Sequence, residues 1–152
     1  MQTTVLKRLA ISMANAVLLL VAFQAAASAP PVLPNPVLAF SGQSFYQVSG
    51  TSFTRYTYFV DNRNAYPGEM FAAAPALPPC GLNTRSSRTW VDVYDQNGKR
   101  LNGFCALSSP DGLVGIWFAL GVDVIPPSWV YIEMTDRQTN IKYKSNLAET
   151  TQ

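Results

Sequence analysis

The chain has 152 residues, of which 48% are hydrophobic and 13% charged, so it holds enough apolar matter for one folded domain and is not disordered throughout. Its formal charge is +2, but Lys7 and Arg8 lie in a segment that we expect to be removed on export, which leaves nine basic and nine acidic residues. This balance excludes the concentrated basic face that nucleic acid or an anionic membrane surface requires. The chain has no histidine, which excludes histidine-dependent catalytic triads, histidine-bearing zinc sites and imidazole acid–base chemistry.

Residues 1–27 have the pattern of a signal peptide. Lys7 and Arg8 precede the apolar run 10–23, and Ala25 and Ala27 fit the small-x-small cleavage rule. Cleavage after Ala29 fits less well, because a proline would follow directly. An uncleaved membrane anchor is the alternative, but the run is short for a span of about 20 residues. The sequence therefore predicts a periplasmic or secreted protein without a membrane span after cleavage.

Residues 28–36 form a proline-rich leader, since four prolines in seven residues can neither enter a helix nor pair as a central strand. We expect a folded domain over residues 37–147 and a polar tail over residues 148–152. At its start, residues 37–40 and 43–48 read as a short strand pair that turns at Ser41-Gly42. Residues 53–61 alternate with the period of a half-buried strand, with Tyr56, Tyr58 and Val60 on one face.

Residues 65–88 are irregular, with room for only a short helical turn around 69–74 because of the prolines that follow. The stretch from Cys80 to Cys105 then contains two strand-like runs around Asn97-Gly98. This dipeptide favours a type I′ hairpin turn, because both residues tolerate positive φ. In an oxidising compartment two cysteines predict a bridge, so we expect a disulfide between Cys80 and Cys105.

After a turn at residues 108–112, residues 113–120 predict a strand with Ile116 and Phe118 on one face. Residues 129–135 predict another strand, in which Val130, Ile132 and Met134 alternate with Trp129, Tyr131 and Glu133. A turn at 136–140 leads into a last strand at 141–144 with its lysines outward. About seven short strands without a helical stretch outside the signal segment predict an all-β antiparallel sandwich.

Two parts of the chain resemble immunoglobulin-like and fibronectin-type-III-like domains. Residues 126–132, with the turn at 136–140 and the run 141–145, resemble the last two strands of such a domain, and residues 90–98 resemble a middle hairpin. The resemblance implies an Ig-like sandwich over residues 37–147. The cysteines are too close in sequence for the inter-sheet bridge of that family, so we expect theirs to pin a local hairpin. Residues 78–147 also resemble a type of small exported bacterial protein, through Pro78-Pro79-Cys80-Gly81, Ser87-Arg88-Thr89-Trp90-Val91 and Gly103-Phe104-Cys105-Ala106-Leu107, a resemblance that implies no activity.

Aromatic residues carry the one indication of binding. If the valines and isoleucines of the predicted strands point to the core, alternation places five aromatic rings on the outer face. Flat rings suit sugar stacking or a protein contact, because they bury much area at low entropic cost. The other interpretation is that the leader and residues 65–88 cover these rings as a second, minor core. The five candidate contact residues are Trp90, Tyr94, Trp117, Trp129 and Tyr131.

Three further hypotheses compete with this one. Asp92 and Glu133, the only acids inside strand-like runs, could serve a small glycan hydrolase or lyase if they shared a cleft. Asp95, Asn97 and Gly98 begin like a calcium loop, to which Asp61, Asn62 and Asp111 could add oxygens, but the rest of the acidic series and its closing glutamate are missing. Plain turn chemistry is the better explanation of these residues. Residues 77–88 could act as the loop of a secreted enzyme inhibitor. The sequence supports no cofactor and no metal site.

The function that the sequence favours is therefore an exported, non-catalytic module of the cell envelope or extracellular space that contacts a protein or a glycan. The two partners have different requirements. A sugar requires exposed, coplanar rings with amide or acid neighbours such as Asp92. A protein requires a wider apolar patch beside an unpaired strand edge.

Overall fold

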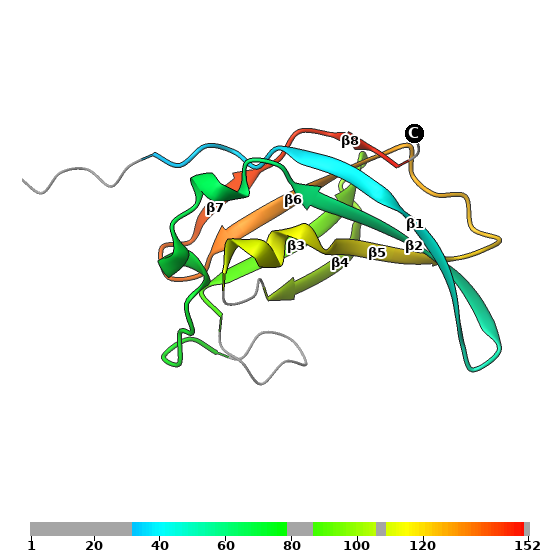
Figure 1. Ribbon diagram of the computed structural model, residues 1–152, viewed down its shortest axis with the longest axis horizontal. Helices are drawn as coiled ribbons and strands as arrows, with labels where there is room; N and C mark the ends of the chain where they lie inside the picture. Colours follow the sequence, from blue (N-terminus) through cyan, green and yellow to red (C-terminus); the bar gives the residue numbers. More distant parts are fainter. Residues whose placement is uncertain (1–31, 79–86, 106–108, 151–152) are drawn as a thin grey trace, which may run out of the picture. The chain divides into compact units, whose positions relative to one another are not determined.

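The computed structural model describes residues 32–78, 87–105 and 109–150, and within these ranges the chain is all-β with two antiparallel sheets (Figure 1). Three short 3₁₀ turns, η1 (Arg63–Ala65), η2 (Gly68–Phe71) and η3 (Pro110–Val114), join some of the strands. None of the helical segments in the described ranges is long and apolar enough to cross a bilayer. The strands are β1 (Leu38–Val48), β2 (Thr51–Val60), β3 (Thr89–Asp95), β4 (Arg100–Cys105), β5 (Ile116–Gly121), β6 (Trp129–Asp136), β7 (Ile141–Lys144) and β8 (Ala148–Glu149).

The strands form one sheet in the order β1-β2-β5 and a second in the order β4-β3-β6-β7, with β8 also paired to β6. Since β3 occupies one edge of β6, β7 and β8 follow one another along its other edge. Ser145 joins them: its backbone N–H donates to the carbonyl of Ile132 and its hydroxyl accepts from the Ile132 N–H at 2.9 Å. Residues 148 and 149, which we assigned to a polar tail, are thus part of the second sheet.

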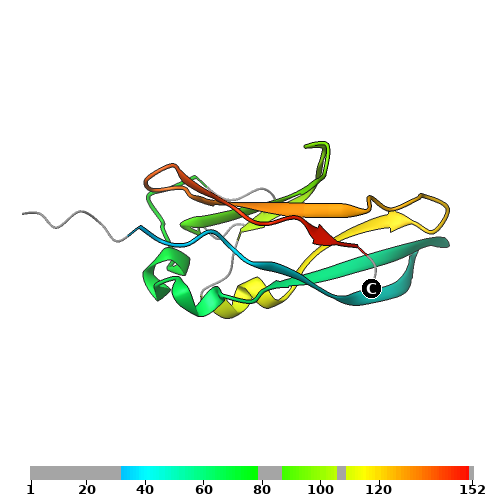
Figure 2. The same ribbon diagram turned by 90° about the horizontal axis from the view of Figure 1, so that it is seen from above.

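The two sheets pack face to face around one core, as Figure 2 shows from above. The alternation predicted for residues 53–61 and 129–135 is confirmed, since one face of each strand is buried. Burial of each such side chain stabilises the fold by about 1.5 to 3 kcal/mol. The inward residues are Tyr56, Tyr58 and Val60 on β2, Ile116 and Phe118 on β5, Val91 and Val93 on β3, and Val130, Ile132 and Met134 on β6.

Residues 63–71 close part of this core rather than covering the tryptophans. Tyr66, Met70 and Phe71 are buried in the main cluster, and Leu33 of the leader packs against it. The Tyr66 hydroxyl donates a hydrogen bond of 2.8 Å to the carbonyl of Pro34, which ties the leader to this segment. Leu33 of the leader and residues 66–71 of the irregular stretch therefore extend the main core. Residues 28–31 and 79–86, which belong to the segments that we considered as a cover for the aromatic face, lie outside the described residues.

The turn that we predicted at Ser41-Gly42 is wrong. Residues 38–48 form one strand, with a bulge between Phe40 and Gly42 where the register against β2 shifts by one residue. The chain turns instead at the second Ser-Gly pair, where Ser49 and Gly50 both have positive φ (49° and 82°), as a two-residue type I′ loop requires. Both dipeptides carry the same turn signal, and the pairing of β1 with β2, which continues past the bulge to Val48 and Thr51, decides between them.

The predicted hairpin around Asn97-Gly98 is present, but its turn type is wrong. Within this turn only Gly98 has positive φ (83°), so the residues from Asp95 to Gly98 form a type I turn followed by a glycine bulge. The Asp95 carboxylate stabilises this form by accepting hydrogen bonds from the N–H groups of Asn97 and Lys99, at 2.8 and 2.9 Å. The predicted disulfide involves Cys80, which lies outside the described residues.

The strand predicted over residues 113–120 begins later, at Ile116. Pro110 favours the first turn of a helix, and residues 110–114 accordingly form η3. This turn directs Leu113 into the core, where the residue is fully buried. The apolar character of Leu113 therefore reflects burial from a 3₁₀ turn and not from a strand.

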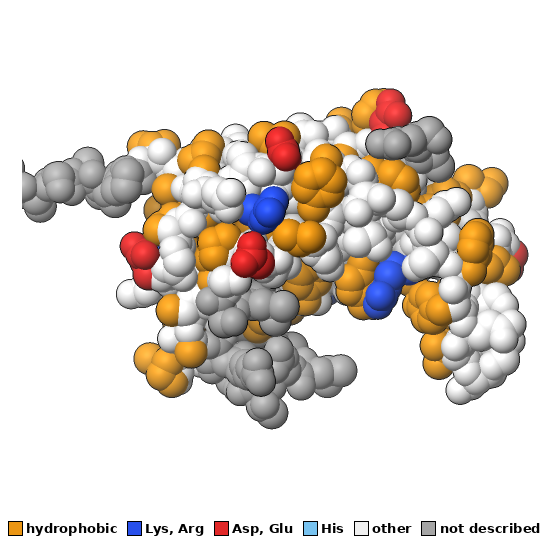
Figure 3. Space-filling view, in the orientation of Figure 1, with side chains coloured by type: hydrophobic (Ala, Val, Ile, Leu, Met, Phe, Trp, Pro, Cys, Tyr) orange, Lys and Arg blue, Asp and Glu red, His pale blue; other side chains and the backbone are white. Residues whose placement is uncertain are grey.

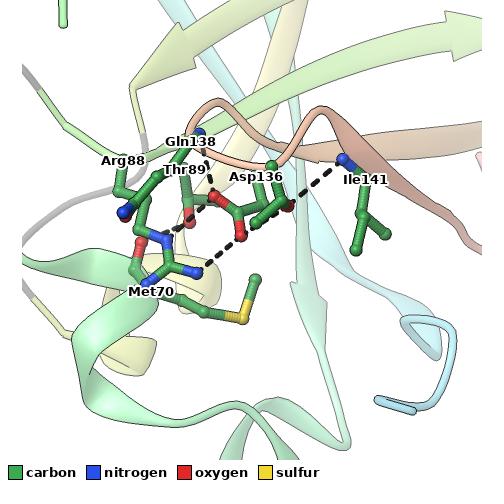
Figure 4. A network of polar contacts seen from close by, with 7 residues as sticks. Met70, Arg88, Thr89, Asp136, Gln138 and Ile141 are labelled. Carbon is green, nitrogen blue, oxygen red and sulfur yellow. Dashed lines mark hydrogen bonds and ion pairs between the residues drawn. The ribbon is translucent and has the colours of Figure 1, made fainter. Parts of the chain in front are cut away.

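A buried ion pair holds the start of β3 to the end of β6 (Figure 4). Arg88 donates from Nε and Nη2 to both carboxylate oxygens of Asp136, at 2.8 and 2.7 Å. The same carboxylate accepts from the backbone N–H of Gln138 and from the hydroxyl of Thr139, which fixes the turn into β7. Thr89, next along the chain, donates to the carbonyl of Met70 and so attaches η2 to the same corner. Asp136 is 2% exposed, and the Arg88 guanidinium lowers its pKa to about 2.

We predict that Asp136→Asn lowers the free energy of unfolding by about 3 kcal/mol, because it leaves the Arg88 guanidinium without its charged partner in a mostly buried site. Urea-induced unfolding near neutral pH measures this loss. Glu133→Gln is the matched control, since it breaks the solvent-exposed pair with Lys142 in the same sheet and should have a much smaller effect. Equal losses in the two variants would contradict the role assigned to Asp136.

The low pKa of Asp136 also predicts a pH dependence. A carboxyl whose pKa falls from 3.8 to about 2 on folding stabilises the fold above pH 3.8, and this contribution is lost as the pH falls toward 2. The stability difference between the wild-type chain and Asp136→Asn should therefore shrink by about 2 kcal/mol over that window. Urea unfolding of both chains at the two ends of the window tests this, and a difference that stays constant would contradict it.

Candidate binding surfaces

The outer face of the five-stranded sheet carries most of the predicted contact residues. Because Val91 and Val93 point inward, their neighbours in β3 point outward, and the same holds in β6 for the neighbours of Val130, Ile132 and Met134. Trp129 is the most exposed of these aromatic rings, at 40%. We call this surface the ladder face: Trp90, Asp92 and Tyr94 on β3, Trp129, Tyr131 and Glu133 on β6, Arg100 on β4, and Lys142 and Lys144 on β7.

The aromatic rings of the ladder face pack against each other and against cations. Tyr94 and Tyr131 lie opposite each other and stack with centroids 5.2 Å apart. Lys144 approaches Tyr131 from the other neighbouring strand, with its ammonium 4.1 Å from the ring centroid. Arg100 lies 5.7 Å from the centroid of Trp90. These contacts occupy ring faces that a sugar would need for stacking.

Asp92 and Glu133 are directly opposite each other in the register of β3 and β6. Each is neutralised by a cation: Arg100 Nε lies 2.5 Å from Asp92 Oδ1, and Lys142 Nζ lies 2.7 Å from Glu133 Oε1. The bond to Glu133 raises the pKa of Lys142. The two carboxylates are thus neighbours on one sheet face, each with its own cation, whereas a glycosidase pair flanks the scissile bond from two sides. In this arrangement each of the two acids has a structural role, as the partner of a cation on a neighbouring strand.

Trp117 does not join the other four predicted residues. It lies on β5, in the three-stranded sheet, where its neighbours Ile116 and Phe118 are buried. The guanidinium of Arg55 lies 4.2 Å from the centroid of Trp117 and 5.8 Å from that of Tyr46. Tyr46 in turn stacks on Phe53 with centroids 5.5 Å apart. We call Tyr46, Phe53, Arg55 and Trp117 the Arg55 cluster.

The β1–β2 hairpin extends beyond the sandwich and carries exposed apolar side chains. In Figure 1 its end, at lower right, lies away from the other strands, and in Figure 3 it projects from the body of the domain. Phe45 is 72% exposed and Val48 is 54% exposed. The loop after β5 adds exposed Val122, Val124 and Ile125, the last at 91%. We call residues 43–53 the hairpin arm; an open hollow beside it is lined by Phe45, Tyr46, Gln47, Ser52 and Val122.

The arm also has an unpaired strand edge. Among the described strands β1 pairs only with β2. At its start, the Asn146 side chain occupies the free edge, accepting from the Leu38 N–H and donating to the Leu38 carbonyl, at 2.7 and 3.0 Å. From Gly42 to Val48, no described segment pairs with that edge. β1 contains no charged residue and no proline, and its bulge lies before Gly42, so the edge from Gly42 to Val48 lacks charges and prolines that commonly protect an edge from pairing.

The sequence interpretation missed the arm and the Arg55 cluster. Dividing residues 37–48 at Ser41-Gly42 concealed the length of β1, and with it the exposed Phe45 and Tyr46. The available signal was the absence of any charge over this long β-rich run. The Asp95 carboxylate of the calcium hypothesis accepts hydrogen bonds within the hairpin turn, as the explanation by turn chemistry expects. Most of the proposed inhibitor loop, residues 79–86, lies outside the described residues.

Comparison of the chain with protein-family models, with curated proteins and with solved structures found no match.

Gly103 provides a test of the ladder face. It lies beside Asp92 in the register, and a Cβ at this position would overlap the Arg100 guanidinium and the Asp92 carboxylate. We predict that Gly103→Ala displaces Arg100 and, because that ion pair is exposed, lowers the free energy of unfolding by less than about 1 kcal/mol. A double-mutant cycle with Arg100→Ala, followed by urea unfolding, should show a smaller cost of Gly103→Ala when Arg100 is absent. Equal costs in both backgrounds would show that Arg100 does not occupy this space.

Proposed function

We propose that this chain is an exported, non-catalytic binding module whose partner is a protein and whose contact surface is the hairpin arm. The observation that carries the proposal is the combination of exposed apolar side chains with an unpaired strand edge, both on the arm. A soluble protein rarely exposes a large apolar patch without a partner for it. An unpaired edge adds main-chain hydrogen-bonding groups, which many peptide-binding domains use for affinity.

The ladder face supports a second candidate function, contact with a glycan. Four of the five predicted aromatic residues gather there, and Trp129 is exposed. Three of its rings, however, already have neighbours on their faces: Trp90 has Arg100, and Tyr131 has both Tyr94 and Lys144. Asp92, which we named as an acid neighbour that could bond a sugar hydroxyl, is paired with Arg100. The geometry therefore favours a protein partner on the arm over a sugar on the ladder face.

For the fold we propose an Ig-like sandwich of the fibronectin-type-III kind. The strand orders β1-β2-β5 and β4-β3-β6-β7 support this assignment. In an Ig domain the first, second and fifth strands of the constant type share a sheet, and the third, sixth and seventh share the other. β4 pairs with β3 rather than β5, as the extra strand of variable-type domains does. Export through the segment 1–27 and the bridge between Cys80 and Cys105 belong to the same proposal and are supported by the sequence alone.

The test compares two variants at surface positions. Phe45→Ser with Ile125→Ser, which we call the arm variant, removes exposed apolar side chains from the arm and from the loop after β5. Trp90→Ala with Trp129→Ala removes rings from the ladder face. Each affinity-tagged chain is expressed in the organism that it comes from and cross-linked there to neighbouring proteins, which are identified by mass spectrometry. Each purified chain is also applied to a glycan array. We expect one protein to be cross-linked saturably by the wild-type chain and by the ladder-face variant, and not by the arm variant.

The melting temperature of each variant separates loss of binding from loss of folding, and the arm positions should leave it unchanged because they are exposed. Glycan binding that disappears only in the ladder-face variant would show that the ladder face, and not the arm, is the binding site. A cross-linked partner that the arm variant retains would refute the proposal.

A further inference from the structure

We propose that the free edge of β1 accepts an extended polypeptide as an added strand, and that Arg55 selects segments carrying a carboxylate beside it. The inference rests on the proposed function and names the chemistry of the protein partner. Three observations carry it: the orientation of the backbone groups of β1, the isolated charge of Arg55, and the apolar side chains on the opposite face of the arm.

The hydrogen-bonding pattern identifies the residues that present free backbone groups. Val122 donates to the carbonyl of Ser52, so the even-numbered residues of β2 bond toward β5 and the odd-numbered ones bond toward β1. Their partners Ser44 and Tyr46 therefore use their N–H and C=O groups within the sheet. The intervening residues present theirs at the free edge, where an added strand would pair with them. These residues are Gln43, Phe45 and Gln47.

Arg55 is an uncompensated charge on this sheet. It is the only charged residue in β1, β2 and β5, and no carboxylate of the described residues lies within ion-pair distance of it. Arg55 is exposed, and its guanidinium lies beside Trp117 on one neighbouring strand and Tyr46 on the other. Figure 3 shows basic surface beside hydrophobic surface where the β1–β2 hairpin begins to extend beyond the sandwich. Cation–π contacts involve the ring faces and leave the N–H groups of the guanidinium available to a carboxylate.

The distances suit an acid on an added strand. Arg55 lies one strand inside the edge, so an added strand would run about 10 Å from β2, which is two strand spacings. The guanidinium lies nearer to Trp117 on β5 than to Tyr46 on β1, so Arg55 would turn toward Tyr46 to meet the acid. With Arg55 in that orientation, the combined length of an arginine and a glutamate side chain covers the distance. Side chains on this face of the added strand would lie beside Tyr46 and Arg55. Those on the other face would lie beside Phe45 and the hollow that it lines with Gln47 and Val122.

The expected partner segment therefore alternates acidic and apolar residues. A second copy of this chain pairing through its own β1 does not meet the requirement, because the strands of this sheet contain no carboxylate. An anionic sugar would satisfy Arg55 but would leave the backbone groups of the edge unpaired. Charge complementarity and the free edge together thus favour an acidic polypeptide.

The experiment uses the exported chain and fluorescently labelled peptides, with binding measured by anisotropy at low ionic strength. The peptides alternate valine with glutamate, with glutamine or with lysine, and an oligouronate is the non-peptide probe. We expect the glutamate peptide to bind about tenfold or more tightly than the glutamine peptide, and the lysine peptide not to bind. Arg55→Gln should abolish this preference, whereas Arg55→Lys should retain part of it.

Backbone methylation tests strand addition without altering the protein. Of two glutamate peptides N-methylated at alternate positions, one loses the N–H groups that face β1 and should not bind, while the other should bind nearly as well as the unmethylated peptide. Equal binding of both, a preference unchanged by Arg55→Gln, or binding of the oligouronate alone would each overturn the inference. If the cross-linked protein partner is retained by Arg55→Gln while no peptide binds, the arm remains the contact surface and only the acidic-strand inference fails.

Discussion

The buried pair of Arg88 and Asp136 is the constraint on which the corner of this domain depends. It connects the residue before β3 to the last residue of β6, and the same carboxylate fixes the turn that returns the chain as β7. Because β7 and β8 cover the edge of β6, the position of that turn decides which edges of the five-stranded sheet are closed. Because both charges are costly to desolvate, removing one partner leaves the other uncompensated in a buried site, and the corner depends on the two being present together.

Much of the fold could be predicted from the sequence because it depends on local periodicity. The alternation of Tyr56, Tyr58 and Val60, and of Val130, Ile132 and Met134, places these residues in the core as predicted. The errors arise where local sequence fits two structures and strand pairing decides between them. Two Ser-Gly pairs carry the same turn signal, and the register of β1 against β2 selects the second. Leu113 satisfies the apolar pattern of a strand but reaches the core from a 3₁₀ turn.

Some features of the candidate site could be predicted from the sequence and others could not. Alternation gives the face of a strand on which a side chain lies, and it correctly placed Trp90, Trp117 and Trp129 opposite buried neighbours. It does not give the sheet to which the strand belongs, which is why Trp117 was grouped with four residues of the other sheet. The cations that cover the rings come from strands far apart in sequence, as with Lys144 on Tyr131. The edge of β1 is free because, among the described strands, only β2 pairs with β1. This can be known only when the pairing of all these strands is known.

The bulge in β1 gives one strand two opposite side-chain phases. Before it, even-numbered Leu38 and Phe40 face the core, and after it, odd-numbered residues such as Phe45 face the same side. A single inserted residue thus separates the sequence requirements of the core from those of the arm. In evolutionary terms, gain or loss of that one residue would exchange the two faces of the arm while leaving Leu38 in place, so the surface that the arm presents can diversify without a change in the packing of the sandwich.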